Sequence, residues 1–387
     1  MDEIELRKTI LKGEDTTLEF KAREKISDIH DLAAESVAFL NKRGGWILLG
    51  VEDDGQIRGF APEEIEDCNR RLRSMAKDQI EPPVILDSEN VPTSAGIVIV
   101  LTIEEGIDKP YQTRKGSAFY IRSGDEKRHV SHRDELRRLF QVGAHVYAEK
   151  QVITGTRLDQ LDFDRYRKFY EATHRREAPQ DEEVLISQMR ALHLVTEDKL
   201  TLAGCLLFAK EPQYILPQFC VKAAWIKGTE LSSTAFEDAR HLEGPLPSLY
   251  QQAFAFLDAW NQRKQPEGTS YNAEGQPNIP LEVFEELLTN ALIHRDYFIQ
   301  DSVKIFIFDD RIEIISPGAL PNSLTVEEAL LGGITRKRNP IIEQVSLTLM
   351  EYKGHGSGLP RVKHLWPRVE FVNNEDAKSF SAILPFD

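Results

Sequence analysis

The chain has 387 residues, of which 41% are hydrophobic, and a formal net charge of −15 at pH 7. This length suffices for two or three domains, each with its own core. No uninterrupted apolar run approaches the roughly 20 residues that span a bilayer, which argues against membrane insertion. The acidic balance argues against a protein that binds nucleic acid over its whole surface, although it leaves room for a local basic patch.

The cellular compartment is indicated by the N-terminus and the cysteines. The opening "MDEIELRKTILKGE" is charged throughout and lacks the basic, apolar and small-residue order of a signal peptide. The three cysteines, Cys68, Cys205 and Cys220, are far apart and show no Cys-x-x-Cys spacing. We expect buried thiols in a reducing cytoplasm.

The first 140 residues alternate between helix and strand patterns. The turn chemistry of Asp54-Gly55 predicts a hairpin, and Asp28 is a helix-capping residue. Helices are expected over 28–45, 63–80 and 131–140, strands over 16–22, 96–103 and 117–124, and the hairpin over 46–60. The pattern predicts a compact α+β domain over residues 1–145.

The remaining chain predicts a linker and a second α+β domain. Residues 146–190 are polar and helical and end in "HRREAPQDEE", so we expect a helical linker before a domain over 191–387. Within that domain we expect two strand runs in 200–226, a long helix over 246–264, a hairpin over 302–318 and a last strand over 378–386.

The helix "FEELLTNALIHRDYF", residues 284–298, carries two different faces. At 100° per residue one stripe is apolar and faces the core; it consists of Phe284, Leu287, Leu288, Ala291 and Leu292. On the other face Glu286, Asn290 and His294 recur every four residues. These three residues form either a solvated helix face or a functional site. Asparagine is a poor helix former, which favours a special role for Asn290.

The C-terminal half contains Glu286-x-x-x-Asn290, then "SPGALP", "RNP" and "GHGSGLPRV" in this order, and a terminal strand. This order resembles the GHKL ATPases, in the branch that is fused to Schlafen-type domains and described as RecG-like regulators. The resemblance covers roughly residues 190–387. It implies a Bergerat-type α/β sandwich that binds ATP and Mg²⁺.

The resemblance also implies residue roles. Asn290 would ligate the Mg²⁺ held by ATP, and Glu286 would be the general base that orients the attacking water. Ser316 stands where the family has a carboxylate that reads adenine, which weakens the expected selectivity for adenine. The other nucleotide contacts implied are His294, Gly318, Arg336, Gly354, Gly356, Ser357 and Gly358. His294 is alternatively structural, and Arg336, Arg338 and Asn339 form either a phosphate-binding lid or a solvated basic loop.

The N-terminal half resembles the Schlafen AlbA-type nucleic-acid-binding domain over roughly residues 10–140. "TTLEFKAREK", "AFLNKRGGWILLGVEDDGQIRGF" and "AFYIRSGDEKRHVSHRDEL" carry this resemblance. Residues 111–138 hold eight Lys or Arg against four acids, which suits a phosphate backbone. The expected nucleic-acid contacts are Lys21, Arg114, Lys115, Arg122, Lys127 and Arg128.

Some Schlafen domains are metal-dependent ribonucleases, and this possibility rests on three acids. Glu14 and Glu19 stand five residues apart, as the resemblance requires, and Asp53 or Asp54 would be the third acid. Ordinary strand alternation and an Asp-Asp-Gly turn explain the same residues without a metal.

The leading hypothesis is a cytoplasmic transcription regulator that binds DNA or RNA through the first domain and is controlled by Mg-ATP, with slow hydrolysis, in the second. The alternatives are an endoribonuclease with an ATP-dependent switch, and an interaction protein whose nucleotide site is vestigial. A homo-oligomer is left open, and no membrane partner is expected.

Overall fold

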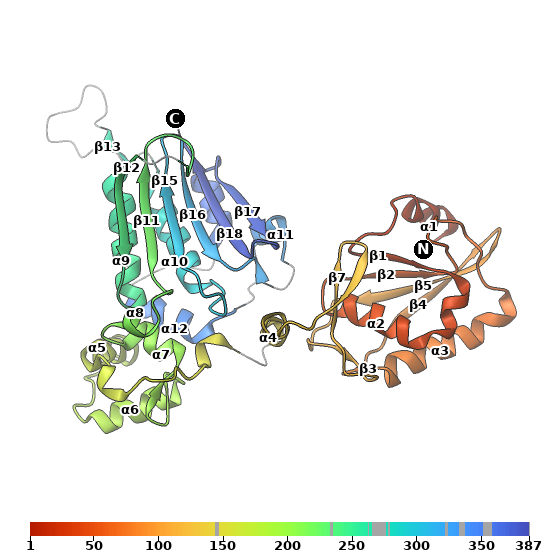
Figure 1. The fold of residues 1–387 in the computed structure, drawn as a ribbon, viewed down its shortest axis with the longest axis horizontal. Coiled ribbons are helices and arrows are strands. Elements are labelled where there is room, and N and C mark those ends of the chain that lie inside the picture. Colours follow the sequence, from red (N-terminus) through yellow and green to blue (C-terminus); the bar gives the residue numbers. More distant parts are fainter. Residues whose placement is uncertain are drawn as a thin grey trace. The chain divides into compact units, whose positions relative to one another are not determined.

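The computed structural model describes residues 1–143, 147–232, 235–261, 263–264, 276–277, 279–321, 324–332, 337–350 and 358–386. The chain forms two compact units, Met1–Val146 and Tyr147–Asp387 (Figure 1). Both units combine helices and strands, which confirms the predicted mixed α and β class.

Unit 1 is built on a four-stranded sheet in the order β1-β2-β5-β4, in which β1 and β2 are parallel and the other pairs antiparallel. Helices α2 and α3 cover one face and α1 covers the other (Figure 1). The helices are α1 (Glu3–Ile10), α2 (Ile29–Leu40), α3 (Ile65–Asp78) and α4 (Arg133–Val142). The strands are β1 (Leu18–Lys21), β2 (Gly44–Leu49), β3 (Ile80–Glu81), β4 (Asp87–Thr93), β5 (Gly96–Glu104), β6 (Gln112–Thr113), β7 (Tyr120–Ser123) and β8 (Glu126–His129).

The local signals in unit 1 act largely as predicted. Asp28 caps α2 by accepting a hydrogen bond from the Asp31 backbone N–H at 3.1 Å. The turn at Asp54-Gly55 forms, with Gly55 at φ +82°. The hairpin expected over residues 46–60 is not formed as two paired strands. Only an isolated bridge joins Val51 and Ile57, because β2 pairs with β1 and β5.

Unit 2 is built on a six-stranded sheet in the order β12-β11-β15-β16-β18-β17, in which β11 and β15 are parallel and the other pairs antiparallel. Helices α9 and α10 lie on one face of this sheet (Figure 1), and α12 and α13 pack against α10. The sheet strands are β11 (Val221–Ile226), β12 (Phe236–Leu242), β15 (Val303–Ile307), β16 (Arg311–Pro317), β17 (Glu370–Asn374) and β18 (Ser379–Pro385).

The other elements of unit 2 are α5 (Phe163–His174), α6 (Glu182–Ala191), α7 (Leu202–Phe208), α8 (Pro212–Ile215), α9 (Leu246–Trp260), α10 (Leu281–Ile293), α11 (Val326–Leu331), α12 (Pro340–Leu349), α13 (Gly358–Leu365) and the short pairs β9 (Val195–Thr196) with β10 (Lys199–Leu200) and β13 (Arg263–Lys264) with β14 (Gln276–Pro277). Residues 147–190, expected as part of a helical linker, contain the helices α5 and α6, which bury Tyr166, Phe169, Leu185 and Met189. The segment is therefore part of the core of unit 2 and not a linker.

One predicted strand is a helix. The apolar run "LTLAGCLLFA" forms α7, in which all seven residues are buried and the Thr201 side chain accepts from the Gly204 backbone N–H at 3.1 Å. A short, continuous apolar run has no period that distinguishes a strand from a buried helix. The prediction was wrong because tertiary burial decided the conformation.

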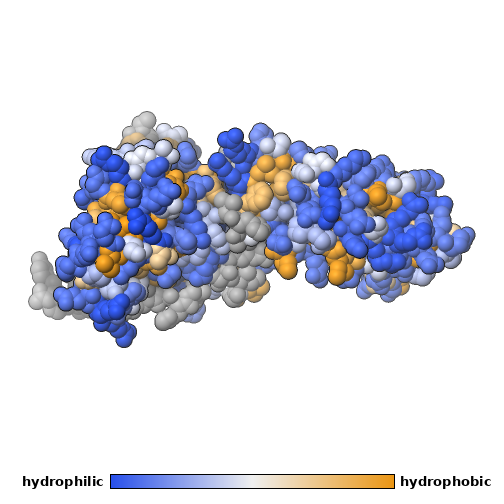
Figure 2. All heavy atoms as spheres, turned by 90° about the horizontal axis from the view of Figure 1, so that it is seen from below, coloured by the Kyte–Doolittle hydropathy of each residue, from blue (hydrophilic) through white to orange (hydrophobic). Residues whose placement is uncertain are grey.

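The cysteines are buried, and the face of the molecule shown in Figure 2 is mainly polar. Cys68, Cys205 and Cys220 are free and buried, as predicted. In the part of the chain that the structure describes, no helix is both long and apolar enough to cross a bilayer. Figure 2 shows a mainly hydrophilic face with separated apolar areas.

Candidate nucleotide site and nucleic-acid interface

Helix α10 carries the candidate nucleotide site. Its apolar stripe is buried as predicted, with Phe284 and Leu288 fully enclosed by the core of unit 2. The opposite line is not simply solvated, because Glu286 is only 4% exposed. Since Glu286 and Asn290 are one turn apart, their side chains lie beside each other on one face.

The Asn290 side chain is incompletely satisfied. Its Nδ2 atom is buried and has no hydrogen-bond partner among the described residues. A buried polar group without a partner costs about 1–3 kcal/mol. Such a group in a candidate site indicates a position where a ligand supplies the missing contact.

The first residue of α13 lies against Glu286. A Cβ atom placed on Gly358 would lie 3.6 Å from the Glu286 Oε1 atom, and Gly358 has φ +32°. The positive φ would strain any other residue here, whereas a Cβ would only be in van der Waals contact with the carboxylate. The N-terminus of α13 therefore opens toward Glu286. The other predicted contacts Arg336, Gly354, Gly356 and Ser357 lie outside the described residues.

The "SPGALP" segment packs against the end of α10. The Ser316 hydroxyl is buried and donates to the Ala291 carbonyl oxygen at 3.0 Å. Gly318 has φ +109°, and a Cβ there would come within 2.6 Å of the Asp296 Cβ. The structure thus gives Ser316 a backbone contact and Gly318 a close-packing role.

The "RNP" segment is part of this packing and not a solvated loop or a lid. Asn339 is 1% exposed, and its Nδ2 atom donates to the carbonyl oxygens of Ile293 at 2.8 Å and Arg295 at 2.9 Å. Arg338 donates to the Ala319 carbonyl oxygen at 2.6 Å. The lid interpretation of Arg338 and Asn339 was wrong, because both side chains are held by backbone carbonyl oxygens.

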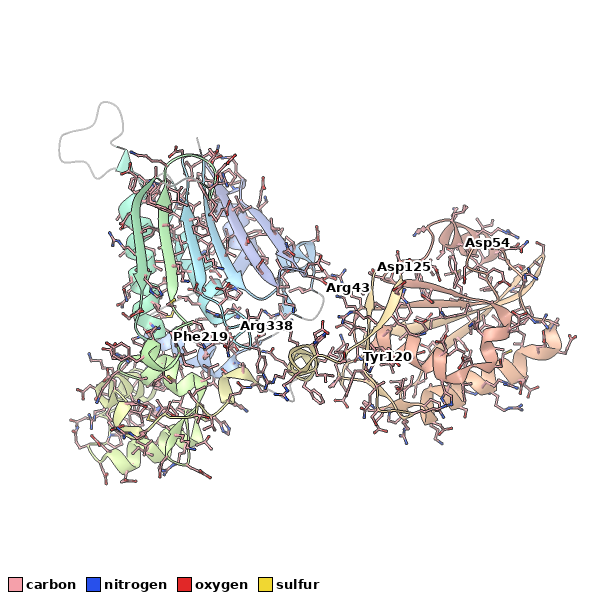
Figure 3. All side chains as sticks on the ribbon, viewed as in Figure 1. Arg43, Asp54, Tyr120, Asp125, Phe219 and Arg338 are labelled. Carbon is pink, nitrogen blue, oxygen red and sulfur yellow. The ribbon has the colours of Figure 1, made fainter. Side chains whose placement is uncertain are left out.

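Arg295, five residues after Asn290, packs inside unit 2. Arg295 is buried and stacks on the rings of Phe219 and Tyr297, at 4.9 and 5.0 Å from its guanidinium carbon. Figure 3 labels Phe219 and Arg338, which lie at the same end of the six-stranded sheet. Burial lowers the pKa of His294, which favours the neutral imidazole. No role for Arg295 was predicted, and its position in the segment 284–298 was the only local signal.

Helix α12 is capped from far away in the sequence. Both carboxylate oxygens of Glu149 accept backbone hydrogen bonds at its N-terminus, from Ile341 at 3.0 Å and Ile342 at 2.8 Å. Burial raises the pKa of Glu149 to about 7, although these two hydrogen bonds act in the opposite direction. Glu149 was not predicted, because no local sequence pattern marks a cap 192 residues from its helix.

The raised pKa of Glu149 predicts a pH dependence. A carboxyl group whose folded pKa lies above its unfolded value stabilises the fold at low pH, and this contribution is lost as the pH rises through the folded value. Between pH 5 and 8 we expect the wild type to lose about 2 kcal/mol of unfolding free energy relative to Glu149→Gln, which cannot ionise. Urea unfolding followed by the tryptophans of unit 2 measures this difference. Parallel pH profiles would contradict the assignment.

A cluster of charged side chains joins β1, α2 and the β7–β8 hairpin in unit 1. Arg122 Nη1 donates to Glu19 Oε2 at 2.8 Å and to Glu35 Oε2 at 3.3 Å. Lys21 Nζ lies 2.5 Å from Glu19 Oε1 and 2.9 Å from Glu35 Oε1. Lys127 Nζ donates to Glu35 Oε1 at 2.8 Å. The hairpin is thereby bound to α2 and β1.

The pKa directions follow from this cluster. Burial, followed by the neighbouring Glu35, raises the pKa of Glu19. Burial opposes ionisation of Glu35 as well, but Lys127 and Lys21 hold its pKa below the usual range. Glu35 was not singled out from the sequence, although a glutamate within the buried run "LAAESVAFL" was a usable signal.

Half of the predicted phosphate contacts belong to this cluster. The Arg122 side chain is 0% exposed, and its Nη2 atom donates to the carbonyl oxygens of Asp15 and Asp125, each at 2.8 Å. Lys21 forms ion pairs with Glu19 and Glu35, and Lys127 forms ion pairs with Glu35 and the neighbouring Asp31. The prediction that Arg122 contacts nucleic acid was wrong, because the carboxylates and carbonyls of its own unit surround it.

Three predicted contacts remain at the surface of unit 1. Lys115 is exposed. Arg114 pairs with Glu81 at 2.8 Å with its side chain 48% exposed, and Arg128 pairs with Glu135 at 2.8 Å with its side chain 41% exposed. Exposed ion pairs of this kind are weak, so a phosphate can replace the carboxylate partner.

The three acids proposed for a nuclease centre do not converge. Glu14 Oε1 accepts from the Phe20 backbone N–H at 2.7 Å, Glu19 lies in the charged cluster, and Asp53 is exposed in the turn. Within the described ranges no group of three or more His, Cys, Asp or Glu residues is placed to hold a metal ion. The predicted second metal site is therefore not formed, since Lys21 and Arg122 already neutralise Glu19.

Family models match both units. Residues 14–131 match the model described as "Schlafen, AlbA_2", and residues 300–376 match the model described as "Putative ATP-dependent DNA helicase recG C-terminal". The chain combines an N-terminal Schlafen AlbA_2 domain with a C-terminal RecG-like domain, as the resemblance implied. No curated protein matches the chain.

Two solved structures are similar. The DIP2311 protein from Corynebacterium diphtheriae is 18% identical, with a TM-score of 0.47, and the match covers 99% of this chain and 80% of that one. The N-terminal domain of a putative ATP-dependent DNA helicase RecG-related protein from Nitrosomonas europaea is 18% identical, with a TM-score of 0.25, and the match covers 33% of this chain and 94% of that one.

Proposed function

We propose that the protein is a nucleic-acid-binding regulator in which unit 2 binds and slowly hydrolyses Mg-ATP, in the manner of a GHKL ATPase, and thereby controls nucleic-acid binding by unit 1. The matches to a Schlafen AlbA_2 domain and to a RecG-like domain support this combination. The observation that carries the proposal is the unpartnered Asn290 Nδ2 donor one turn from buried Glu286.

The residues present fit a magnesium-bound nucleotide. The buried Asn290 Nδ2 atom is a donor without a partner, which a phosphate oxygen can satisfy, and Gly358 leaves the space beside Glu286 free of a side chain. A carboxamide oxygen is a neutral hard ligand, so Asn290 would hold Mg²⁺, and the ion would neutralise charge on the phosphates. The N–H groups at the start of α13 favour an anion, and Glu286 would orient a water molecule and accept its proton.

The test of this site is the Asn290→Ala variant. We expect its affinity for Mg-ATP to fall at least tenfold, about 1.4 kcal/mol, because the side chain proposed to ligate the magnesium ion is removed. Isothermal calorimetry measures the affinity, with Asn90→Ala on the exposed strand β4 as the matched control. Equal affinities of the variant and the wild type would remove Asn290 from the nucleotide site.

The surface cations predict a salt-dependent effect. Reversing Arg114 and Lys115 to glutamate should weaken binding about equally for all nucleic-acid sequences and reduce the slope of log affinity against log salt by about 2. The control replaces Lys8, in α1, and Lys12, just after it, with glutamate. Both lysines are exposed, so this variant has the same change in net charge. An unchanged slope in the Arg114 and Lys115 variant would place the binding surface elsewhere.

The endoribonuclease alternative has less support. It needs three acids around a metal ion, and Glu19 is bound by Lys21 and Arg122 instead. The third hypothesis is an interaction protein whose nucleotide site is vestigial. Measuring Mg-ATP binding distinguishes it from our proposal, because such a protein would not bind Mg-ATP.

A further inference from the structure

The start of unit 2 is tied to the nucleotide-site helix by polar contacts. Glu149 lies two residues after Tyr147, where unit 2 begins, and it is 0% exposed. Its carboxylate holds the N-terminus of α12 through the backbone N–H groups of Ile341 and Ile342. These two N–H groups favour the charged carboxylate more than the nearby Lys150 does, and both lower the pKa that burial raises.

The contacts continue from α12 to α10. Asn339 immediately precedes α12 and donates to the carbonyl oxygens of Ile293 and Arg295, at the C-terminal end of α10. The Asn290 carbonyl oxygen accepts the His294 N–H at 3.1 Å in this last turn. Hydrogen bonds and three to four residues of helix thus connect Glu149 to the turn that presents Asn290.

This arrangement is unusual for a helix cap. A capping side chain normally stands just before its helix in the sequence, whereas Glu149 caps a backbone N–H 192 residues away. Burying a carboxylate without a cation is costly, and an uncharged acceptor would satisfy the same donors at lower cost. The contact fixes the chain segment that leaves unit 1 onto the helix that holds α10.

We propose that Glu149 is a positioning residue that couples the nucleotide site to unit 1, through the N-terminus of α12 and Asn339. This inference rests on the proposed function. Nucleic acid bound to unit 1 restrains the chain that enters unit 2 at Tyr147, and Glu149 transmits this restraint to the last turn of α10. Because coupling between two binding sites is reciprocal, Mg-ATP changes nucleic-acid affinity by the same factor as nucleic acid changes Mg-ATP affinity.

The experiment measures this coupling in the full chain. Calorimetry gives the Kd of Mg-ATP without nucleic acid and with a saturating random-sequence duplex DNA, or random-sequence RNA if it binds more tightly. The variants are Glu149→Gln, which preserves the shape, and Glu149→Ala. The matched control is Glu171→Gln on α5, whose exposed carboxylate also accepts a backbone N–H, from Ala178 at 3.3 Å.

We expect a coupling factor of at least about fivefold in the wild type and in Glu171→Gln. In Glu149→Gln and Glu149→Ala it should fall below about twofold, while Mg-ATP and nucleic acid each still bind alone. A purely structural cap would change stability and leave the coupling factor intact.

Two results would overturn the inference alone: wild-type coupling in a folded Glu149 variant, or a wild type that binds both ligands without coupling. Failure of the wild type to bind Mg-ATP or nucleic acid would instead overturn the proposed function, and the inference with it.

Discussion

Replacing Glu286 with glutamine is expected to lower ATP hydrolysis by roughly 10²–10⁴-fold while Mg-ATP still binds. The Glu286 carboxylate is nearly enclosed and lies beside Gly358 at the start of α13. A glutamine has almost the same shape but cannot accept a proton from water. Phosphate release measures turnover, and calorimetry measures binding separately.

The control for this experiment lies one turn away. Glu282, in the first turn of α10, is exposed, so Glu282→Gln should leave turnover within about twofold of the wild type. Unchanged turnover in Glu286→Gln would remove Glu286 from the chemistry, even if the nucleotide binds at Asn290.

Replacing Arg122 with alanine is expected to destabilise unit 1 by about 3–5 kcal/mol, because it leaves the buried Glu19 and Glu35 with less opposite charge. Two backbone carbonyl oxygens would lose their donor, and Phe39 would lose the guanidinium that stacks 4.7 Å from its ring centroid. Hydrogen exchange of residues 1–143 in increasing urea measures this loss separately from unit 2.

Arg128 provides the matched comparison on the same hairpin. Its side chain is exposed and makes a surface pair with Glu135, so Arg128→Ala should cost less than about 1 kcal/mol. Equal losses for the two arginines would show that the charged cluster contributes no more than an ordinary surface ion pair.

The parts of the site that were predictable depend on local spacing. The period of α10 places Phe284 and Leu288 in the core and Glu286 beside Asn290, whatever surrounds the helix. The cap at Asp28 and the turn at Asp54-Gly55 likewise depend on a few neighbouring residues. Such features follow from backbone geometry and can be read from sequence.

The parts that were missed depend on distant contacts. Arg122 meets Glu19 across 103 residues, and Asn339 meets the end of α10 across 46. Charged side chains are normally at the surface, so a basic segment was interpreted as exposed. The strand predicted for the apolar run of α7 was wrong for a related reason. All seven residues are buried, so the sequence has no periodicity that distinguishes a helix from a strand.

The most direct test of a nucleic-acid-binding regulator governed by Mg-ATP uses the full chain and labelled DNA and RNA. Binding and integrity of the nucleic acid are measured together, with Mn²⁺ or EDTA and with or without Mg-ATP. We expect the nucleic acid to be bound and to stay intact, and Mg-ATP to change its affinity. Metal-dependent cleavage that is abolished by Glu19→Ala would contradict it and establish the nuclease instead.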